Sequence, residues 1–479
     1  MEPILKLFYI PILMFFLLLF FHERAAYATE VIGIGWGETE VAAKREALLD
    51  ISSRISVTVR SKFKSVQAVN SLSVNNKLSE TVNLTTEITT ETSSELPILG
   101  ADFTFKKIGS QISAEAKLET IKNLPLYERR MGQLRNRITT LNKSLEKAQT
   151  GESKYSTITS IFTLLDEFNK LNIVTSYLGG TQQDPGVSED ILQNQLRTVT
   201  KQVDNLDLAA KLLLEGINES GIYIFPAKSR NSNEITAFGA LIKDKLSTQL
   251  KSIQNPSEAD FTLIGQYEES ENGLDITYRL IDGSSVAQKT NSVRVLKEAY
   301  RGVETKPKSL DFDQLLKSGV ALSGNLRVNI SSNFGSHDLL FHGNDEVEFF
   351  VKLSESGYFY VLGHSLKANE NNSYMLELHE SEGARKFVYF VNADDANKWI
   401  SIGKFNVIAP FGVEGLQVFA SNKDLVDNLP PIKLDSDSGL YLVSANPKEG
   451  ILKTRAIVKK FSKTALMSEA SLMFTSKEK

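Results

Sequence analysis

The histidines are the residues of this sequence best suited to chemistry, because imidazole binds metals and exchanges protons near neutral pH. Beyond position 30 they are His337, His342, His364 and His379. Zinc sites need three or four ligands, commonly with short spacings such as His-x3-His. The spacings here are 5, 22 and 15, and the chain contains no cysteine. We therefore interpret these histidines as surface or strand-edge residues, and we predict no metal site.

Nucleophiles and paired acids also fail to form a recognisable catalytic set. The stretch Gly363-His364-Ser365-Leu366-Lys367 lacks the second glycine of the Gly-x-Ser-x-Gly turn that positions a serine nucleophile. Asp394-Asp395 and the pair Glu346 and Glu348 could serve hydrolysis, although neighbouring acids more often form a solvated face. No Gly-x-x-x-x-Gly-Lys-Ser/Thr motif occurs, which excludes a P-loop nucleotide site. We expect no catalytic residue and no cofactor.

Three aromatic positions could instead bind a partner or a sugar. Pro410-Phe411-Gly412 would present Phe411 on a rigid turn, and Trp36 and Trp399 could stack on a sugar ring. Proline fixes φ and glycine accepts special backbone angles, so the same turn also serves structure. We favour a structural role at all three positions, with Phe411 covering a core and each tryptophan filling a core edge.

Length and composition indicate a multidomain globular protein. The chain has 479 residues, of which 41% are hydrophobic, so about three domains are expected. The formal net charge of −4 gives no basic excess of the kind that nucleic-acid-binding proteins carry. We therefore expect no nucleic acid partner.

Residues 1–28 are predicted to be a secretory signal peptide. The run Leu7–Phe21 is apolar, Lys6 precedes it, and Ala26-Tyr27-Ala28 has the A-x-A pattern of a cleavage site. Its 15 residues are fewer than the roughly 20 that span a bilayer, and retention as an anchor is the alternative. Without cysteine, neither disulfides nor an amino-terminal lipid anchor is available. We predict a periplasmic or secreted protein of a Gram-negative envelope.

Residues 29–123 are predicted to form an N-terminal α+β domain. A glycine-rich strand at 31–37 leads into a helix at 38–55, where apolar residues at three- and four-residue steps form one stripe. Gly33-x-Gly35 lacks the third glycine of a dinucleotide fingerprint, so we interpret it as a strand that turns into a helix. The strands predicted to follow are Ile55–Val59, two within Ser71–Glu95, Phe103–Phe105 and Ile112–Leu118.

The first of these elements carry a family resemblance. The motifs are Gly33-x-Gly35 and the spaced residues Ala42, Ala43 and Ala47, within about residues 31–120. This part of the chain resembles the small outer-membrane lipoproteins of helical pathogens and the amino-terminal domain of flagellar assembly protein T. The resemblance implies association with the outer membrane, but lipid anchoring does not carry over because the lipoprotein cysteine is absent.

Residues 124–217 are predicted to form a helical hairpin bundle. Apolar residues alternate at three- and four-residue steps, which is typical of coiled-coil-like seams. We expect three helices that pack on one another, and the alternative is that a seam is offered to a partner. The seams are Tyr127–Ala148, Ile158–Leu171 and Leu192–Leu206.

Residues 218–305 are predicted to form a small β-α-β-β domain. A buried-type strand at 222–225 precedes a helix at 237–250, and Asn272-Gly273 predicts the turn of a hairpin between 261–265 and 274–281. By its patterning, this order resembles the middle domains of the curli secretion-channel protein and of penicillin-binding-protein activator lipoproteins.

Residues 318–476 are predicted to form a C-terminal antiparallel β-sandwich. Val347, Phe349 and Val351 alternate with polar positions, as in a strand with one buried face. The module resembles a bacterial domain family of unassigned function with an immunoglobulin-like sandwich, found at the ends of exported envelope proteins. The resemblance rests on 343–347, 357–361 and Pro410-Phe411-Gly412-Val413-Glu414. A last pair of strands is predicted at Thr454–Val458 and Glu469–Thr475.

Taken together, these elements predict an α+β multidomain protein of the cell envelope that is not an enzyme. We expect an assembly or interaction adaptor for a flagellar, secretion or cell-wall machine, with envelope proteins as partners. The alternative is an envelope hydrolase that acts on cell-wall material through the acids of the C-terminal module. The sequence specifies neither the identity of the partners nor the oligomeric state.

Overall fold

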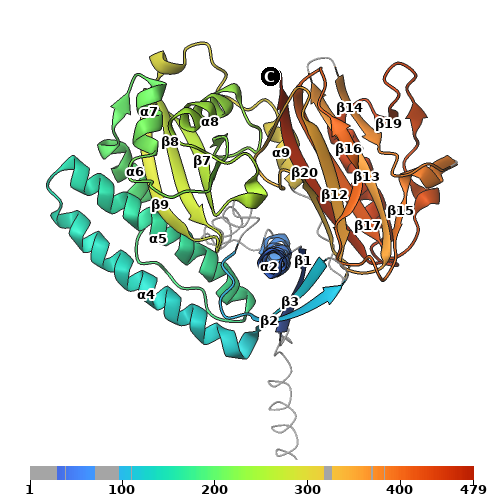
Figure 1. Cartoon of the computed structure of the whole chain (residues 1–479), viewed down its shortest axis with the longest axis horizontal. Helices are drawn as coiled ribbons and strands as arrows, with labels where there is room; N and C mark the ends of the chain where they lie inside the picture. Colours follow the sequence, from blue (N-terminus) through green and yellow to red (C-terminus); the bar gives the residue numbers. More distant parts are fainter. Residues whose placement is uncertain are drawn as a thin grey trace, which may run out of the picture.

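The structure, a computed structural model, describes residues 30–37, 39–70, 96–108, 111–317, 326–367, 370–381 and 383–479. Figure 1 shows a small N-terminal sheet with helix α2, a lobe of helices and a mixed sheet, and a C-terminal lobe of β-sheets. This is the α+β multidomain architecture that the sequence predicts, with a β-rich C-terminal region. The predicted signal peptide lies outside the described residues. Within them, no helix is both long and apolar enough to cross a membrane.

An antiparallel sheet of order β1-β3-β2 begins the described chain, and α2 packs across one face of it. Gly33 and Gly35 of β1 face this helix, because a Cβ at either position would lie 2.2 Å from helix backbone atoms. The glycines therefore allow strand and helix to approach closely, which accounts for the Gly-x-Gly pattern by packing. The elements are β1 (Glu30–Gly37), α2 (Glu40–Asn70), β2 (Asp102–Ile108) and β3 (Gln111–Glu119).

Helix α2 is longer than the sequence pattern predicts. The prediction of a strand at 55–59 is wrong, because α2 continues without a break to Asn70. Ile55 and Val59 extend the four-residue repeat that begins at Ala43, and all three are buried. Packing of this stripe outweighs the lower helix propensity of β-branched residues. The two strands predicted within 71–95 lie outside the described residues.

Two long helices, α4 and α5, form a hairpin whose apolar faces share one core with the N-terminal sheet (Figure 1). The predicted seam of α4 is buried, with Tyr127 and Ile138 fully enclosed. The third predicted seam is interrupted, because α6 ends at Val199 and Val203 enters a strand that pairs with β9. The elements are α4 (Thr120–Lys147), α5 (Gly151–Tyr177), α6 (Glu189–Val199), β4 (Gln202–Val203) and α7 (Leu206–Leu213).

A mixed sheet of order β4-β9-β8-β7-β5, with β6 also paired to β7, lies against α5 (Figure 1). It contains the predicted β-α-β-β order, and the predicted hairpin is β7 with β8, whose last pair is Ser270 opposite Gly273. The elements are β5 (Ile222–Ile224), β6 (Lys228–Ser229), α8 (Ala237–Gln249), β7 (Phe261–Ser270), β8 (Gly273–Asp282) and β9 (Ala287–Leu296).

Two sheets form the C-terminal lobe, and their order is β10-β12-β16 and β11-β20-β17-β13-β14-β19-β18, with β15 paired to β13. Val347, Phe349 and Val351 of β12 are buried between them, as their alternation predicts. The pairing is antiparallel except that β11 runs parallel to β20. The strands are β10 (Val328–Ser332), β11 (Leu339–His342), β12 (Glu346–Leu353), β13 (Gly357–Lys367), β14 (Glu370–Met375), β15 (Tyr389–Val391), β16 (Ile400–Asn406), β17 (Gly412–Ser421), β18 (Lys433–Leu434), β19 (Tyr441–Ser444) and β20 (Met467–Lys477).

A helix stands where one of the last two strands is predicted. The prediction of a strand at 454–458 is wrong, because this segment belongs to α10 (Pro447–Phe461). Asn446 caps the helix by accepting a hydrogen bond from the Lys448 amide, and Pro447 suits its first turn. These start signals outweigh the β-branched run. Helix α9 (Leu310–Lys317) packs beside α10. Short 3-10 segments are Pro256–Glu258, Lys297–Tyr300, Gly383–Phe387 and Val426–Asn428.

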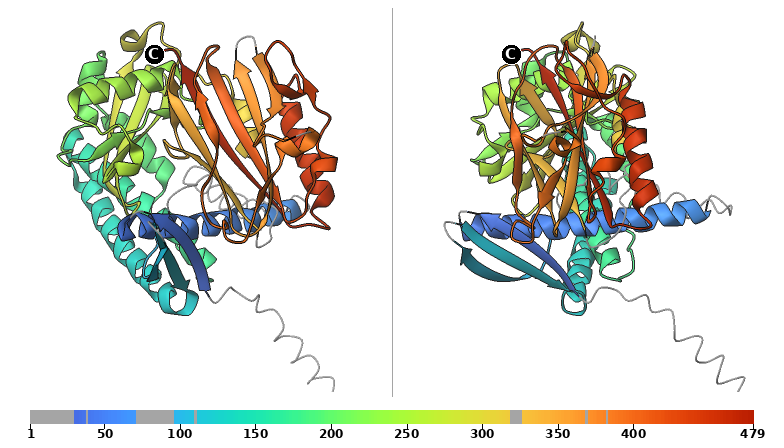
Figure 2. Two further views of the ribbon diagram at one scale, coloured as in Figure 1. Left: turned by 45° about the vertical axis from the view of Figure 1, so that its right-hand side comes forward. Right: turned by 90° about the vertical axis from the view of Figure 1, so that its right-hand side faces the viewer.

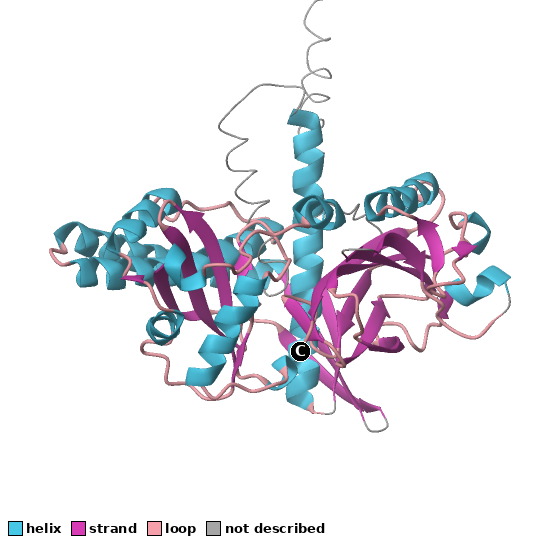
Figure 3. Cartoon of the chain, turned by 90° about the horizontal axis from the view of Figure 1, so that it is seen from above, coloured by secondary structure: helices cyan, strands magenta, loops and turns pink. Residues whose placement is uncertain are grey.

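Helix α2 lies where the N-terminal sheet, the helical lobe and the C-terminal lobe come together. Seen from above, this helix passes between the helical lobe and the C-terminal lobe (Figure 3). From the side, it extends well beyond the N-terminal sheet and runs beneath the C-terminal lobe (Figure 2). Side chains of α2 contact both lobes, because Arg45 donates to the Ala259 carbonyl at 3.5 Å and Glu46 accepts a hydrogen bond from Lys352 at 2.9 Å.

Candidate interaction cleft between the modules

A cleft of about 1600 Å³ lies where α2, α5, the mixed sheet and the C-terminal sandwich meet. Its walls come from parts of the chain that are far apart in sequence, and ionisable side chains gather along them. The charged residues that bear most on its chemistry are Glu46, Asp50, Asp166, Glu268, Arg279 and Lys352.

The carboxylate of Glu46 joins the N-terminal sheet to the C-terminal sandwich. It accepts a hydrogen bond of 2.8 Å from the Trp36 amide and one of 2.9 Å from Lys352 Nζ. The Lys352 side chain is only 5% exposed, and its Nζ lies 4.6 Å from the centre of the Trp399 ring. Lys398 Nζ lies 5.5 Å from the Trp36 ring. Both tryptophans thus face lysines at the junction of the modules.

One turn further along α2, Asp50 makes a similar contact with β1. It accepts a hydrogen bond of 3.0 Å from the Ile34 amide and is held by Arg54 at 2.8 Å. The amides of Ile34 and Trp36 point away from β3, so the two carboxylates satisfy the open edge of β1. A helix that covers a strand edge in this way blocks pairing with a further strand.

The α5 wall carries a buried ionic group centred on Asp166. Lys170 Nζ and Arg279 Nη1 each lie 2.9 Å from its carboxylate oxygens. Burial favours the neutral form, but the charges of Lys170 and Arg279 hold the pKa of Asp166 below its usual value. Lys170 also donates to the Ser285 carbonyl at 3.1 Å. Asp166 is therefore an ionised anchor between α5 and the mixed sheet and is unsuited to donating a proton.

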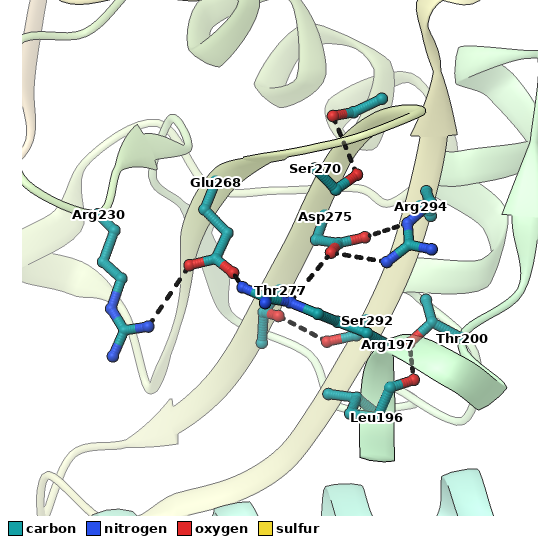
Figure 4. A network of polar contacts seen from close by, with 11 residues as sticks. Leu196, Arg197, Thr200, Arg230, Glu268, Ser270, Asp275, Thr277, Ser292 and Arg294 are labelled. Atoms are coloured by element: carbon teal, nitrogen blue, oxygen red, sulfur yellow. Dashed lines mark hydrogen bonds and ion pairs between the residues drawn. The ribbon is translucent and has the colours of Figure 1, made fainter. Parts of the chain in front are cut away.

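On the mixed sheet, three arginines surround two carboxylates (Figure 4). Arg294 binds Asp275 through two nitrogens at 2.6 and 2.9 Å, and the hydrogen bond to Asp275 raises the arginine pKa. Arg197 of α6 binds Glu268 and lies 3.7 Å from Asp275, while Arg230 approaches Glu268 at 3.4 Å. The network fixes α6 and the segment after β6 to the sheet, and it commits both carboxylates to cations.

Further contacts join the mixed sheet to the C-terminal sandwich. Lys228 Nζ lies 2.8 Å from Asp338, and the amide of Ile235 donates to the Thr475 hydroxyl at 3.0 Å. The amide of Asn233 donates to Asp313 of α9 at 2.6 Å. The walls of the cleft are therefore fastened to one another by polar contacts rather than by a continuous apolar core.

The structure separates the four histidines considered from sequence. His364 is fully buried between Ser373 at 2.7 Å and Gln417 at 3.2 Å, and burial lowers its pKa to about 4. The prediction of a surface or strand-edge position is therefore wrong for His364, because its strand β13 lies inside its sheet between β17 and β14. Burial also lowers the pKa of His342. His337 contacts a neighbouring serine, and His379 contacts the Val388 carbonyl. Among the residues that the structure describes, no group of three or more His, Asp or Glu side chains could hold a metal.

The acidic pairs considered for hydrolysis lie outside the cleft. Glu346 pairs with Lys404 at 3.0 Å, and Glu348 accepts a hydrogen bond of 2.6 Å from the Ser401 hydroxyl. Asp395 accepts a hydrogen bond of 2.7 Å from the side-chain amide of Asn392. These carboxylates follow the solvent-facing side of the C-terminal lobe and do not face one another across a pocket.

The turn at Pro410-Phe411-Gly412 serves packing. A Cβ at Gly343 would lie 3.0 Å from the Phe411 ring, and a Cβ at Gly412 would lie 2.8 Å from the Leu366 carbonyl oxygen. The turn therefore fits closely against its neighbours.

The sequence analysis did not identify the charged groups of the cleft. Asp166 and Lys170, two charged residues inside the apolar repeat of α5, were a usable signal.

No protein-family model and no curated protein matches this chain. Among solved structures, the secreted protein HP1454 of the human pathogen Helicobacter pylori matches with 12% identity and a TM-score of 0.24. The match covers 60% of this chain and 92% of that one. At this TM-score the match transfers no property to this chain.

Proposed function

We propose that this protein is a non-enzymatic exported adaptor of the cell envelope that holds a segment of a partner protein in the cleft. The observation that carries the proposal is that every wall of the cleft is tied to another by polar contacts, as Glu46 is to Lys352 and Lys228 to Asp338. Such a frame has its shape before a ligand arrives, and preorganisation reduces the entropy lost on binding.

The size of the cleft favours a protein segment as its ligand. Small-molecule pockets are usually about 300–1,000 Å³, whereas this cleft measures about 1600 Å³ and has paired charges along its walls. Because the cations and carboxylates neutralise one another, a segment of mixed polar residues suits it better than a polyanion. The apolar run before residue 28 supports export, and the resemblances of the separate modules support a flagellar, secretion or cell-wall machine as the partner.

An occlusion experiment tests this proposal. Asn329 and Ser331 of β10 line the cleft, while Val328 and Ile330, which alternate with them, are buried in the sandwich core. Asn329→Trp should therefore obstruct one wall of the cleft without disturbing the core, and Lys433→Trp on the exposed strand β18 is the matched control. The proposal predicts that the unmodified chain and Lys433→Trp run on native gels in a large complex with envelope proteins, and that Asn329→Trp runs as the free chain. Equal behaviour of the two variants would contradict the proposal.

The same preparations test the hydrolase alternative. Purified cell-wall sacculi incubated with the protein should release no soluble fragments if the protein is an adaptor. Release of fragments that disappears in Asp394→Asn/Asp395→Asn would replace the adaptor with an envelope hydrolase.

A further inference from the structure

Helix α4 is the outermost layer of the helical lobe. Figure 1 shows α5 between α4 and the mixed sheet, so in the described part of the chain only one side of α4 packs against protein. On that side Tyr127, Met131, Leu134 and Ile138 are fully buried. The opposite side faces solvent along all 28 residues, which corresponds to about 42 Å.

The solvent face of α4 carries a row of cations. At 100° per residue, Arg129, Lys143 and Lys147 fall within about 40° of one another and point away from the buried stripe. None of the three forms a hydrogen bond or ion pair with another described residue. The two acids of α4, Glu128 and Glu146, lie about a quarter of a turn to one side. A basic face therefore stands on a chain whose formal net charge is −4.

The first turns of α4 add exposed apolar groups to this face. Ile121 is 85% exposed and Leu126 is 37% exposed, and they flank the line of cations on either side. Exposed apolar residues combined with basic residues are typical of helices that lie in a membrane interface. The cations from Arg129 to Lys147 extend over about 27 Å of the helix, which also fits a flat surface better than it fits a compact ligand.

The start of the described chain lies at the same end of α4. Glu30 of β1 pairs with Glu119, the residue directly before α4 begins at Thr120. The apolar run that ends at Phe21 is 9 residues upstream of Glu30. The apolar run enters a membrane during export, and a retained run would stay there. Because only a short length of chain separates this run from β1, that membrane lies close to the basic face.

We propose that the solvent face of α4 lies against an anionic lipid surface of the envelope, with Arg129, Lys143 and Lys147 contacting headgroup phosphates and Ile121 entering the interface. The cleft is formed by other elements, so this attachment is independent of what the cleft binds. An acidic partner protein is the competing occupant. An acidic protein would complement the charge of the cations, but its binding would give no role to the exposed apolar residues.

Vesicle binding tests this proposal with the mature chain, purified after export and removal of residues 1–28. The vesicles contain either phosphatidylcholine alone or phosphatidylcholine with 30 mol% phosphatidylglycerol, about the anionic content that gives a strong surface potential. We expect sedimentation with the anionic vesicles only, and release at about 0.5 M salt because exposed charges are then screened. Equal binding to both vesicles would overturn the proposal.

Two triple variants with the same net charge locate the contact. Each basic residue near an anionic surface contributes about 1 kcal/mol, so Arg129→Gln/Lys143→Gln/Lys147→Gln should weaken the partition coefficient about 100-fold. Lys433→Gln/Lys459→Gln/Lys463→Gln removes the same amount of charge from the C-terminal lobe. This variant should change the partition coefficient less than about threefold. Arg129→Lys/Lys143→Arg/Lys147→Arg should retain binding. Equal loss in the two triple variants, or binding of polyglutamate without binding of vesicles, would contradict a lipid surface.

Discussion

Glu46 and Lys352 are joined by a contact of 2.9 Å although 306 residues separate them in the sequence. Both side chains are largely buried, with exposed fractions of 16% and 5%. Glu46 also holds the edge of β1 through the Trp36 amide. One carboxylate thus fixes the N-terminal sheet and the C-terminal sandwich in a single arrangement, and this arrangement shapes one wall of the cleft.

Breaking this pair should destabilise the frame through the charge left behind. Lys352→Met removes one partner and leaves Glu46 buried without its cation, which costs about 3 kcal/mol. In Glu46→Gln/Lys352→Met no charge remains, so the double variant should lose much less than the sum of the two single variants. Denaturation followed by tryptophan fluorescence measures this, because both tryptophans of the chain lie at the junction. Additive losses would contradict the coupling.

The pair of Arg294 with Asp275 should behave in the same way inside the mixed sheet. Their side chains are 11% and 10% exposed, so Arg294→Met leaves a poorly solvated carboxylate whose other cation, Arg197, is 3.7 Å away. We expect a loss of about 3 kcal/mol in unfolding free energy. Arg135→Met changes an exposed arginine of α4 and should alter stability by less than about 0.5 kcal/mol. Chemical denaturation of the two variants compares them, and equal losses would show that the pair is energetically unimportant.

Acidification should destabilise the C-terminal lobe through His364. Burial lowers its pKa to about 4, whereas an unfolded histidine has a pKa of about 6.5. Between these values the unfolded chain binds the proton more strongly, so stability is fully present above about pH 6.5 and falls toward pH 4. The loss reaches about 3 kcal/mol.

Unfolding midpoints measured at pH 7 and pH 5 check this prediction. His364→Gln should show a smaller drop between the two pH values than the unmodified chain. His379→Gln, at an exposed position, should keep the unmodified chain's pH dependence. If His364→Gln is as acid-sensitive as the unmodified chain, another group is responsible.

Glycine at position 35 should be required for the packing of β1 on α2. A Cβ there would lie 2.2 Å from both the Ala43 carbonyl oxygen and the Ala47 amide nitrogen, so Gly35→Ala forces strand and helix apart. Overpacking of this kind costs about 1–3 kcal/mol. Gly132→Ala is the opposite control, because nothing lies within 4 Å of a Cβ at that position in α4, and alanine favours helix by about 0.5–1 kcal/mol. Hydrogen exchange of α2 peptides should increase only in Gly35→Ala.

Periodicity predicted the elements whose pattern agrees with their burial. The alternation at Val347, Phe349 and Val351 appears in β12, and the turn at Asn272-Gly273 joins β7 to β8. Periodicity wrongly predicted strands where β-branched residues coincide with the apolar stripe of a helix. Ile55 to Val59 and Thr454 to Val458 both have strand-like composition, yet packing and helix-start signals keep them in α2 and α10.

The cleft could not be predicted from sequence because none of its charged groups forms a local motif. Glu46, Asp166, Arg279 and Lys352 come from different modules and meet only through the tertiary arrangement. The histidines drew attention for their chemistry, but they are dispersed through the C-terminal lobe. Asp166 and Lys170 are the exception, because two charged residues four positions apart on a buried face of α5 indicate a buried ion pair.

Photocrosslinking inside the envelope tests whether the cleft holds a segment of a partner protein. A benzophenone side chain placed at Asn329 or at Gln193 would report from two different walls of the cleft, and one at Lys433 would report from the outer surface. We expect the two cleft positions to capture the same envelope protein and Lys433 not to capture it. No adduct from either wall, or the same adduct from all three positions, would contradict it.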